Sequence, residues 1–158
     1  MSPLPPERSA FAAALALLTG RALTVGELDA RLRRRGYDAD AIAETTARLL
    51  EFGYLDDRRT AVAWAEVAAQ IRGLGPRRLR EGLAKRRLPR EIVEETVAGL
   101  FAQGEEVRLA QAVLAKWERA KGRAADAASR HAGYVHLRRR GFSGAASRAA
   151  LFNRSEIE

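Results

Sequence analysis

The sequence contains no cysteine, which excludes a disulfide framework and any metal site built from thiolates. Histidine is almost as scarce: His131 and His136 are the only two, and a spacing of five positions along a helix places them on different faces. The glycine-rich signatures of phosphate and dinucleotide loops are missing as well. We therefore expect no metal site and no cofactor.

Long apolar runs are also missing, since none approaches the roughly 20 residues that a membrane-spanning helix needs. The segment Ala10 to Leu18 is apolar, but only Arg8 precedes it as a basic residue, and Gly20-Arg21 follows it. This pattern does not fit a signal peptide. We expect a cytoplasmic protein with no membrane partner.

Aromatic residues make up only 6% of the 158 residues, and there are only five prolines. The apolar share is 47%, which is enough for a core, and it consists mostly of alanine, leucine and valine. These residues, with the abundant arginine and glutamate, favour helix over sheet. The sequence predicts an all-α fold.

Periodic apolar positions and capping residues predict about nine helices. Thr24 with Glu27 forms a capping-box pattern, while Asp56 and Asp57 are structural helix caps at the positive end of a helix dipole. On that helix, Ala61, Trp64 and Ile71 are expected on one buried face. The helices are expected near residues 5–18, 25–35, 38–52, 57–72, 76–87, 89–100, 105–120, 126–140 and 143–152.

A short signature recurs in three of these helices: a leucine, a mostly basic run, then an apolar residue. The copies are Leu32-RRRG-Tyr37, Leu83-AKRR-Leu88 and Leu137-RRRG-Phe142. Their spacing near 50 residues indicates three tandem three-helix repeats, over residues 1–53, 54–103 and 104–158. Such repeats stack, so we expect an elongated, curved array that forms one continuous structural unit, with a frayed tail at 153–158.

Positive charge dominates the surface chemistry, with a net charge of +8 and a pI near 10.9. Such a balance indicates an acidic partner, either nucleic acid or an acidic protein. A charge run is often only a solvated face, but here cations crowd together without acids to neutralise them. We expect a non-specific, salt-sensitive contact surface formed by Arg72, Arg77, Arg78, Arg80, Lys85, Arg86, Arg87, Arg138, Arg139 and Arg140.

No set of residues predicts catalysis. The neighbouring carboxylates Asp56 and Asp57 diverge by about 100° on a helix, so helix capping explains them better than acid–base chemistry. Trp64 and Trp117 could stack on nucleic-acid bases, but both lie on apolar faces, which favours core packing. We expect a monomeric binding protein with no catalytic residue.

Two stretches carry a family resemblance, GYLDDRRTAVAWAEVAAQIRGLGPRRLREGLAKRRLPREIV from Gly53 and LRRRGFSGAASRAAL from Leu137. In this order and at this distance they resemble the RecX family, the regulatory proteins of the bacterial recombinase RecA, and the resemblance covers nearly the whole chain. The chain departs from the family pattern at several positions, with Thr60 in place of an aromatic residue, Gly82 in place of glutamate, Arg87-Leu88 in place of a Gly-Ile pair, and the small Ala145-Ala146.

The resemblance implies tandem three-helix repeats and a protein that binds RecA–DNA filaments in their helical groove. Family members inhibit recombinase, coprotease and ATPase activity, which implies a role in recombinational DNA repair and the SOS response. The partners implied are the RecA filament and single- or double-stranded DNA without sequence specificity. The alternative is a basic, helix-turn-helix-like DNA-binding regulator with no recombinase partner.

Overall fold

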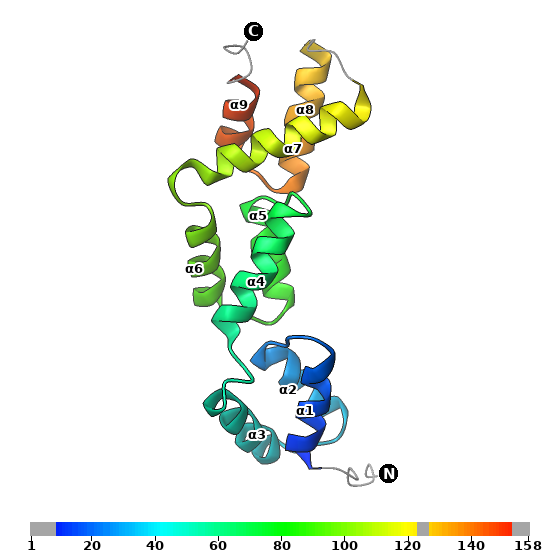
Figure 1. Ribbon diagram of the computed structural model, residues 1–158, viewed down its shortest axis with the longest axis vertical. Helices are drawn as coiled ribbons and strands as arrows, with labels where there is room; N and C mark the ends of the chain where they lie inside the picture. Colours follow the sequence, from blue (N-terminus) through cyan, green and yellow to red (C-terminus); the bar gives the residue numbers. More distant parts are fainter. Residues whose placement is uncertain (1–8, 123–126, 153–158) are drawn as a thin grey trace.

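The computed structural model describes residues 9–122 and 127–152, and Figure 1 shows that the chain forms an elongated stack. Within these residues it contains nine α-helices, one 3-10 turn and no strand, which confirms the all-α expectation. The helices are α1 (Ala10–Gly20), α2 (Val25–Arg34), α3 (Ala39–Glu51), α4 (Asp57–Gln70), α5 (Pro76–Lys85), α6 (Arg90–Leu100), α7 (Glu105–Lys121), α8 (Ala127–Arg140) and α9 (Gly144–Phe152), with the turn η1 (Ala102–Gly104) before α7.

The helix starts follow local capping chemistry. Thr24 and Glu27 form a complete capping box at α2, and the Asp56 side chain accepts a hydrogen bond from the backbone N–H of Arg59 at the start of α4. At the first helix, Ser9 is the N-cap and α1 begins at Ala10. The earlier start expected at residues 5–6 lies outside the described residues.

The helices pack as three triplets, and each triplet has its own apolar core. The leucine of the recurring signature is fully buried in every case, as Leu32 in α2, Leu83 in α5 and Leu137 in α8. Ile71 differs from expectation: its side chain is 72% exposed, because α4 ends at Gln70 and the chain turns toward α5. The middle helix of each triplet thus contributes the repeated leucine to a core that the outer helices share.

The middle helices α2, α5 and α8 follow one another along the long axis (Figure 1). The C-terminal end of α8 meets the N-terminal end of α5: the Gly75 N–H donates to the Arg140 carbonyl at 2.9 Å, and the Arg77 N–H donates to the Gly141 carbonyl at 3.1 Å. At the other end of α5, the Thr24 hydroxyl donates to the Arg86 carbonyl at 2.6 Å. The triplets are therefore joined by polar bonds between helix ends, with the helix dipoles aligned head to tail.

Small residues allow the backbones to approach at both junctions. A Cβ added to Gly75 would lie 2.5 Å from the Phe142 nitrogen, and a Cβ on Gly26 would lie 2.6 Å from the Arg87 Cβ. A different contact requires glycine at position 82, because a Cβ there would lie 2.1 Å from the ring of Trp64. The Trp64 ring thus occupies the space that any side chain at position 82 would need.

Replacing Gly75 with alanine is expected to lower the free energy of unfolding by about 1–3 kcal/mol, because the methyl group overlaps the backbone of the next triplet. Backbone strain does not contribute, since Gly75 has an ordinary φ of −82°. Gly99→Ala on α6 is the matched control: nothing lies within 4 Å of an added Cβ, and the gain in helix propensity should stabilise the protein slightly. Chemical denaturation of both variants checks this expectation, and equal stability of the two would contradict it.

Candidate basic interface

The two arginine clusters that lie far apart in the sequence meet at the junction between α5 and α8. The Arg77 guanidinium donates to the Arg138 carbonyl at 3.2 Å, and the Arg78 Nε donates to the Arg139 carbonyl at 3.1 Å. The Arg140 guanidinium donates to the carbonyl of Arg72. These side chains therefore cap the exposed carbonyls of helix ends, which is a structural role in addition to any binding.

Acidic neighbours are closer than the sequence indicated. Glu81, one turn further along α5, pairs with Arg77 at 2.7 Å and with Arg78 at 2.9 Å, and Glu94 of α6 pairs with Arg80 at 3.0 Å. Hydrogen bonding from Arg78 lowers the pKa of Glu81 below its usual value. The expectation that these cations crowd together without neutralising acids is wrong for these three arginines, because the partners come from the next turn and the next helix.

Arg86 faces inward, toward the first triplet. Its guanidinium pairs with Glu27 at 2.9 Å and also donates to the Ala22 carbonyl at 2.9 Å, and the side chains of Arg86 and Glu27 are only 14% and 13% exposed. We call this pair the Glu27–Arg86 clasp. At the start of α2, the Asp57 carboxylate of α4 accepts a hydrogen bond from the Val25 N–H at 2.8 Å.

The clasp sets the ionisation of Glu27. Burial alone would raise the pKa of this carboxyl group, but hydrogen bonds from Arg86 and from the Thr24 N–H, with the charges of Arg86 and Arg21, outweigh burial and lower it. Sequence reasoning identified Glu27 only as part of a local capping box and missed this long-range role. The basic run that follows Leu83 was the available signal, because a helix end rich in cations attracts a carboxylate.

Four of the expected contact residues remain exposed and form neither an ion pair nor a side-chain hydrogen bond within the described part of the chain. They are Arg72, Lys85, Arg87 and Arg139. Arg138 is also exposed, but its guanidinium donates to the Phe142 carbonyl. Arg87 has a left-handed backbone with φ of 59°, at the position where the other two signatures have Gly36 and Gly141. These four cations are the ones whose charge is available to a partner.

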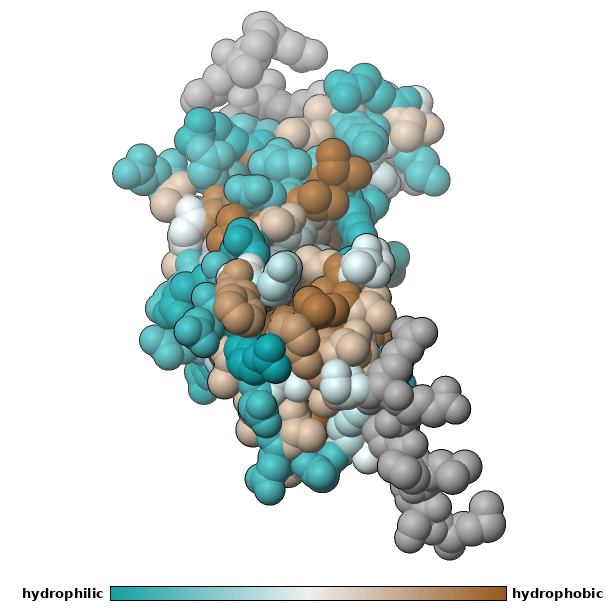
Figure 2. Space-filling model, turned by 60° about the horizontal axis from the view of Figure 1, so that its bottom comes forward, coloured by the Kyte–Doolittle hydropathy of each residue, from teal (hydrophilic) through white to brown (hydrophobic). Residues whose placement is uncertain are grey.

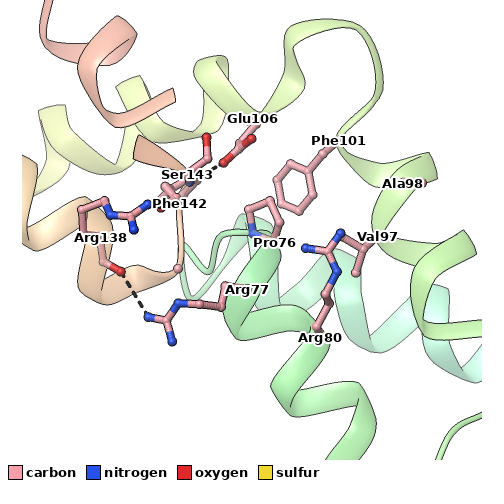
Figure 3. Close-up of a pocket in the computed structure, with 11 residues that line it drawn as sticks. Pro76, Arg77, Arg80, Val97, Ala98, Phe101, Glu106, Arg138, Phe142 and Ser143 are labelled. Atoms are coloured by element: carbon pink, nitrogen blue, oxygen red, sulfur yellow. Dashed lines mark hydrogen bonds between the residues drawn. The ribbon is translucent and has the colours of Figure 1, made fainter. Parts of the chain in front are cut away.

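A cavity of about 300 Å³ lies between the second and third triplets, beside the α5–α8 junction (Figure 3). Arg77, Arg80 and Arg138 line it together with Glu106, whose carboxylate accepts a hydrogen bond from the Ser143 N–H at 2.6 Å. Figure 3 shows that the Arg77 side chain extends toward the backbone carbonyl of Arg138. Glu106 therefore caps the start of α9. We call this cavity, with its lining of Arg77, Arg80 and Arg138, the arginine seam between the second and third triplets.

Two classes of site find no support in residues 9–122 and 127–152. No group of three or more histidine, cysteine, aspartate or glutamate residues in these ranges is arranged to hold a metal ion. No helix in the same ranges is long and apolar enough to cross a membrane.

Comparison with known proteins identifies the family. A family model described as "RecX, first three-helix domain" matches residues 10–49, and "RecX, second three-helix domain" matches residues 56–97. The chain is 32% identical over 147 residues to "Regulatory protein RecX" of Deinococcus radiodurans, covering 93% of this chain and 69% of that protein. The chain belongs to the RecX family.

Other RecX proteins agree with this assignment. The "Regulatory protein RecX" of Mycolicibacterium vanbaalenii is 38% identical over 112 residues, 71% of this chain, and the match spans 61% of the length of that relative. The crystal structure of RecX from Lactobacillus salivarius has a TM-score of 0.83 at 19% identity and covers 94% of this chain and 96% of that one. The latter likeness shows the shared fold, and the curated relatives are named regulatory proteins.

The Glu27–Arg86 clasp yields a pH-dependent prediction. Glu27→Gln should lower the free energy of unfolding by about 1–3 kcal/mol at pH 7, because it removes charge-assisted hydrogen bonds to a largely buried arginine. The folded pKa of Glu27 lies below its usual value of 4.5, so the contribution is complete above that pH and is lost as the pH falls through the folded pKa. Denaturation of both proteins between pH 7 and pH 3 measures it.

The matched control is Asp29→Asn, which removes the exposed ion pair of Asp29 with Arg33 on the same helix and should leave stability unchanged. A difference between wild type and Glu27→Gln that stays constant down to pH 3 would contradict a role for the ionised clasp.

Proposed function

We propose that this RecX-family protein binds RecA–DNA filaments in their helical groove and inhibits or remodels RecA during recombinational DNA repair and the SOS response. The observation that supports this proposal most is a set of exposed cations that form no ion pair within the described residues. Lys85 and Arg87 lie at the C-terminal end of α5, and Arg72 and Arg139 lie near its N-terminal end, where α8 meets it. A basic surface extended along a rod fits a long polyanionic filament better than a small substrate. The protein acts by binding, without a reaction or a cofactor of its own.

The contact with DNA in this proposal is made to phosphates. Lysine and arginine side chains on helix surfaces reach phosphate oxygens without reading bases, so binding is independent of sequence and weakens as salt rises. The three triplets, with the sequence-derived bounds 1–53, 54–103 and 104–158, give the protein a length over which it can contact neighbouring protomers of one filament. The polar junctions hold those contacts in a fixed register.

Charge reversal at the exposed cations tests the proposal. The double variant Lys85→Glu with Arg139→Glu should weaken inhibition of RecA strand exchange by roughly tenfold or more. It should also reduce the slope of log affinity for DNA against log salt by about 1.5–2, if each side chain neutralises one phosphate. Neither side chain is in an ion pair within the described residues, so folding should be intact by circular dichroism.

The control variant carries the same change of charge elsewhere. Arg90 at the start of α6 and Arg119 on α7 are exposed and also lack ion pairs in the described part, so Arg90→Glu with Arg119→Glu should retain inhibition. If both double variants lose inhibition equally, net charge alone explains the effect. If Lys85→Glu with Arg139→Glu inhibits like the wild type, the assigned surface is refuted. Tight binding to one duplex sequence without RecA would favour a promoter-binding regulator instead.

A further inference from the structure

A second cavity, of about 470 Å³, lies between the end of α4 and the helices α7 and α8. Its volume is within the range of about 300–1,000 Å³ that is usual for pockets that hold small molecules. We call it the Trp117 groove, because Trp117 lies in its wall; the other residues that matter are Ile71, Arg72, Lys116, His136 and Arg140. The groove is separate from the seam that is lined by Arg77 and Arg138.

One wall of the Trp117 groove is aromatic. The rings of Trp117 and His136 are stacked, with centroids 5.1 Å apart and planes 21° from parallel. Burial, and then the charge of Arg140, lower the pKa of His136, which favours the neutral imidazole and lets it add ring surface rather than charge. Ile71, which is 72% exposed, adds apolar surface at the end of α4.

The charge around this wall is all of one sign. Arg72 comes from the turn after α4, Lys116 from α7 and Arg140 from the end of α8, and none of the described residues that line the groove is acidic. The Arg140 guanidinium is held in place by its hydrogen bond to the Arg72 carbonyl. This composition contrasts with the cavity at the arginine seam, where Glu106 lies among the cations.

We propose that the Trp117 groove binds one base of single-stranded DNA against its aromatic and apolar wall, with Arg72, Lys116 and Arg140 on the flanking phosphates. Proteins that bind single strands combine stacking surfaces with a cationic track in this way, and stacking is tolerant of sequence. A duplex keeps its bases inside the stack, so the groove selects single strands. This inference rests on the proposed function, because it supplies a DNA contact where the second and third triplets meet.

Tryptophan fluorescence gives a direct readout. Trp64 and Trp117 are the only two tryptophans, so Trp64→Phe leaves Trp117 as the sole reporter. An oligo(dT) strand should quench Trp117, whereas an abasic strand of the same length should bind at least tenfold more weakly at this site, and poly-aspartate should not quench. If the abasic strand quenches equally well, the groove binds phosphate alone and the base-binding proposal fails. Quenching by poly-aspartate would instead show a site for acidic peptides and overturn it too.

Matched variants localise the effect. Lys116→Glu should weaken the affinity for oligo(dT) at least tenfold, and Ile71→Ala should weaken binding of oligo(dT) more than binding of the abasic strand. Arg90→Glu on α6, with the same charge change, should leave the affinity within about threefold of the wild type, because one distant charge is largely screened. Fluorescence anisotropy of a labelled strand repeats these comparisons with Trp64 intact, in case Trp64→Phe folds poorly.

RecA assays separate this inference from the proposed function. If Lys116→Glu binds oligo(dT) like the wild type while the wild-type protein inhibits strand exchange, the groove proposal is overturned and the proposed function stands. If oligo(dT) binding depends on Lys116 but the wild type does not inhibit RecA, the proposed function fails, and with it the role of the groove in a filament.

Discussion

Unsatisfied backbone groups at helix ends are the constraint on which this architecture depends. A helix leaves its last carbonyls without partners, and an isolated triplet of short helices would expose them to water. Here the carbonyls at the end of α8 accept hydrogen bonds from Gly75 and the side chains of Arg77 and Arg78, and the Arg86 carbonyl at the end of α5 accepts one from Thr24. The same bonds that complete the helices therefore join the triplets.

This constraint gives the arginines two competing roles. The guanidinium of Arg86 pairs with Glu27 in the clasp. The guanidinium of Arg77 pairs with Glu81 and also donates to the Arg138 carbonyl of α8. Lys85, which directly precedes Arg86, and Arg139, whose carbonyl accepts from Arg78, are exposed and keep their charge available. A basic run at a helix end thus divides into residues that stabilise the junction and residues that are free to meet a partner, according to which way each faces.

Sequence patterns were sufficient for the helices and for most of their core positions, because capping residues and apolar periodicity are local. Thr24, Asp56 and the repeated leucines show this directly. Sequence patterns were insufficient for the interface, because the partner of a guanidinium group can lie on a helix roughly 60 positions away, as with Arg86 and Glu27. The exposure of Ile71 and the filling of space beside Gly82 by Trp64 were equally invisible, since both depend on how neighbouring helices pack.

The order of the junctions also gives the molecule a direction. The C-terminal end of α8 abuts α5, and the C-terminal end of α5 abuts α2, so all three middle helices point the same way along the rod. The two ends of this rod are therefore different, so turning the rod end over end does not superimpose it on itself. A rod made of two halves related by a two-fold axis would superimpose. On a filament that itself has a direction, the two orientations of this protein are not equivalent. In only one of them does each repeat face the same features of the filament.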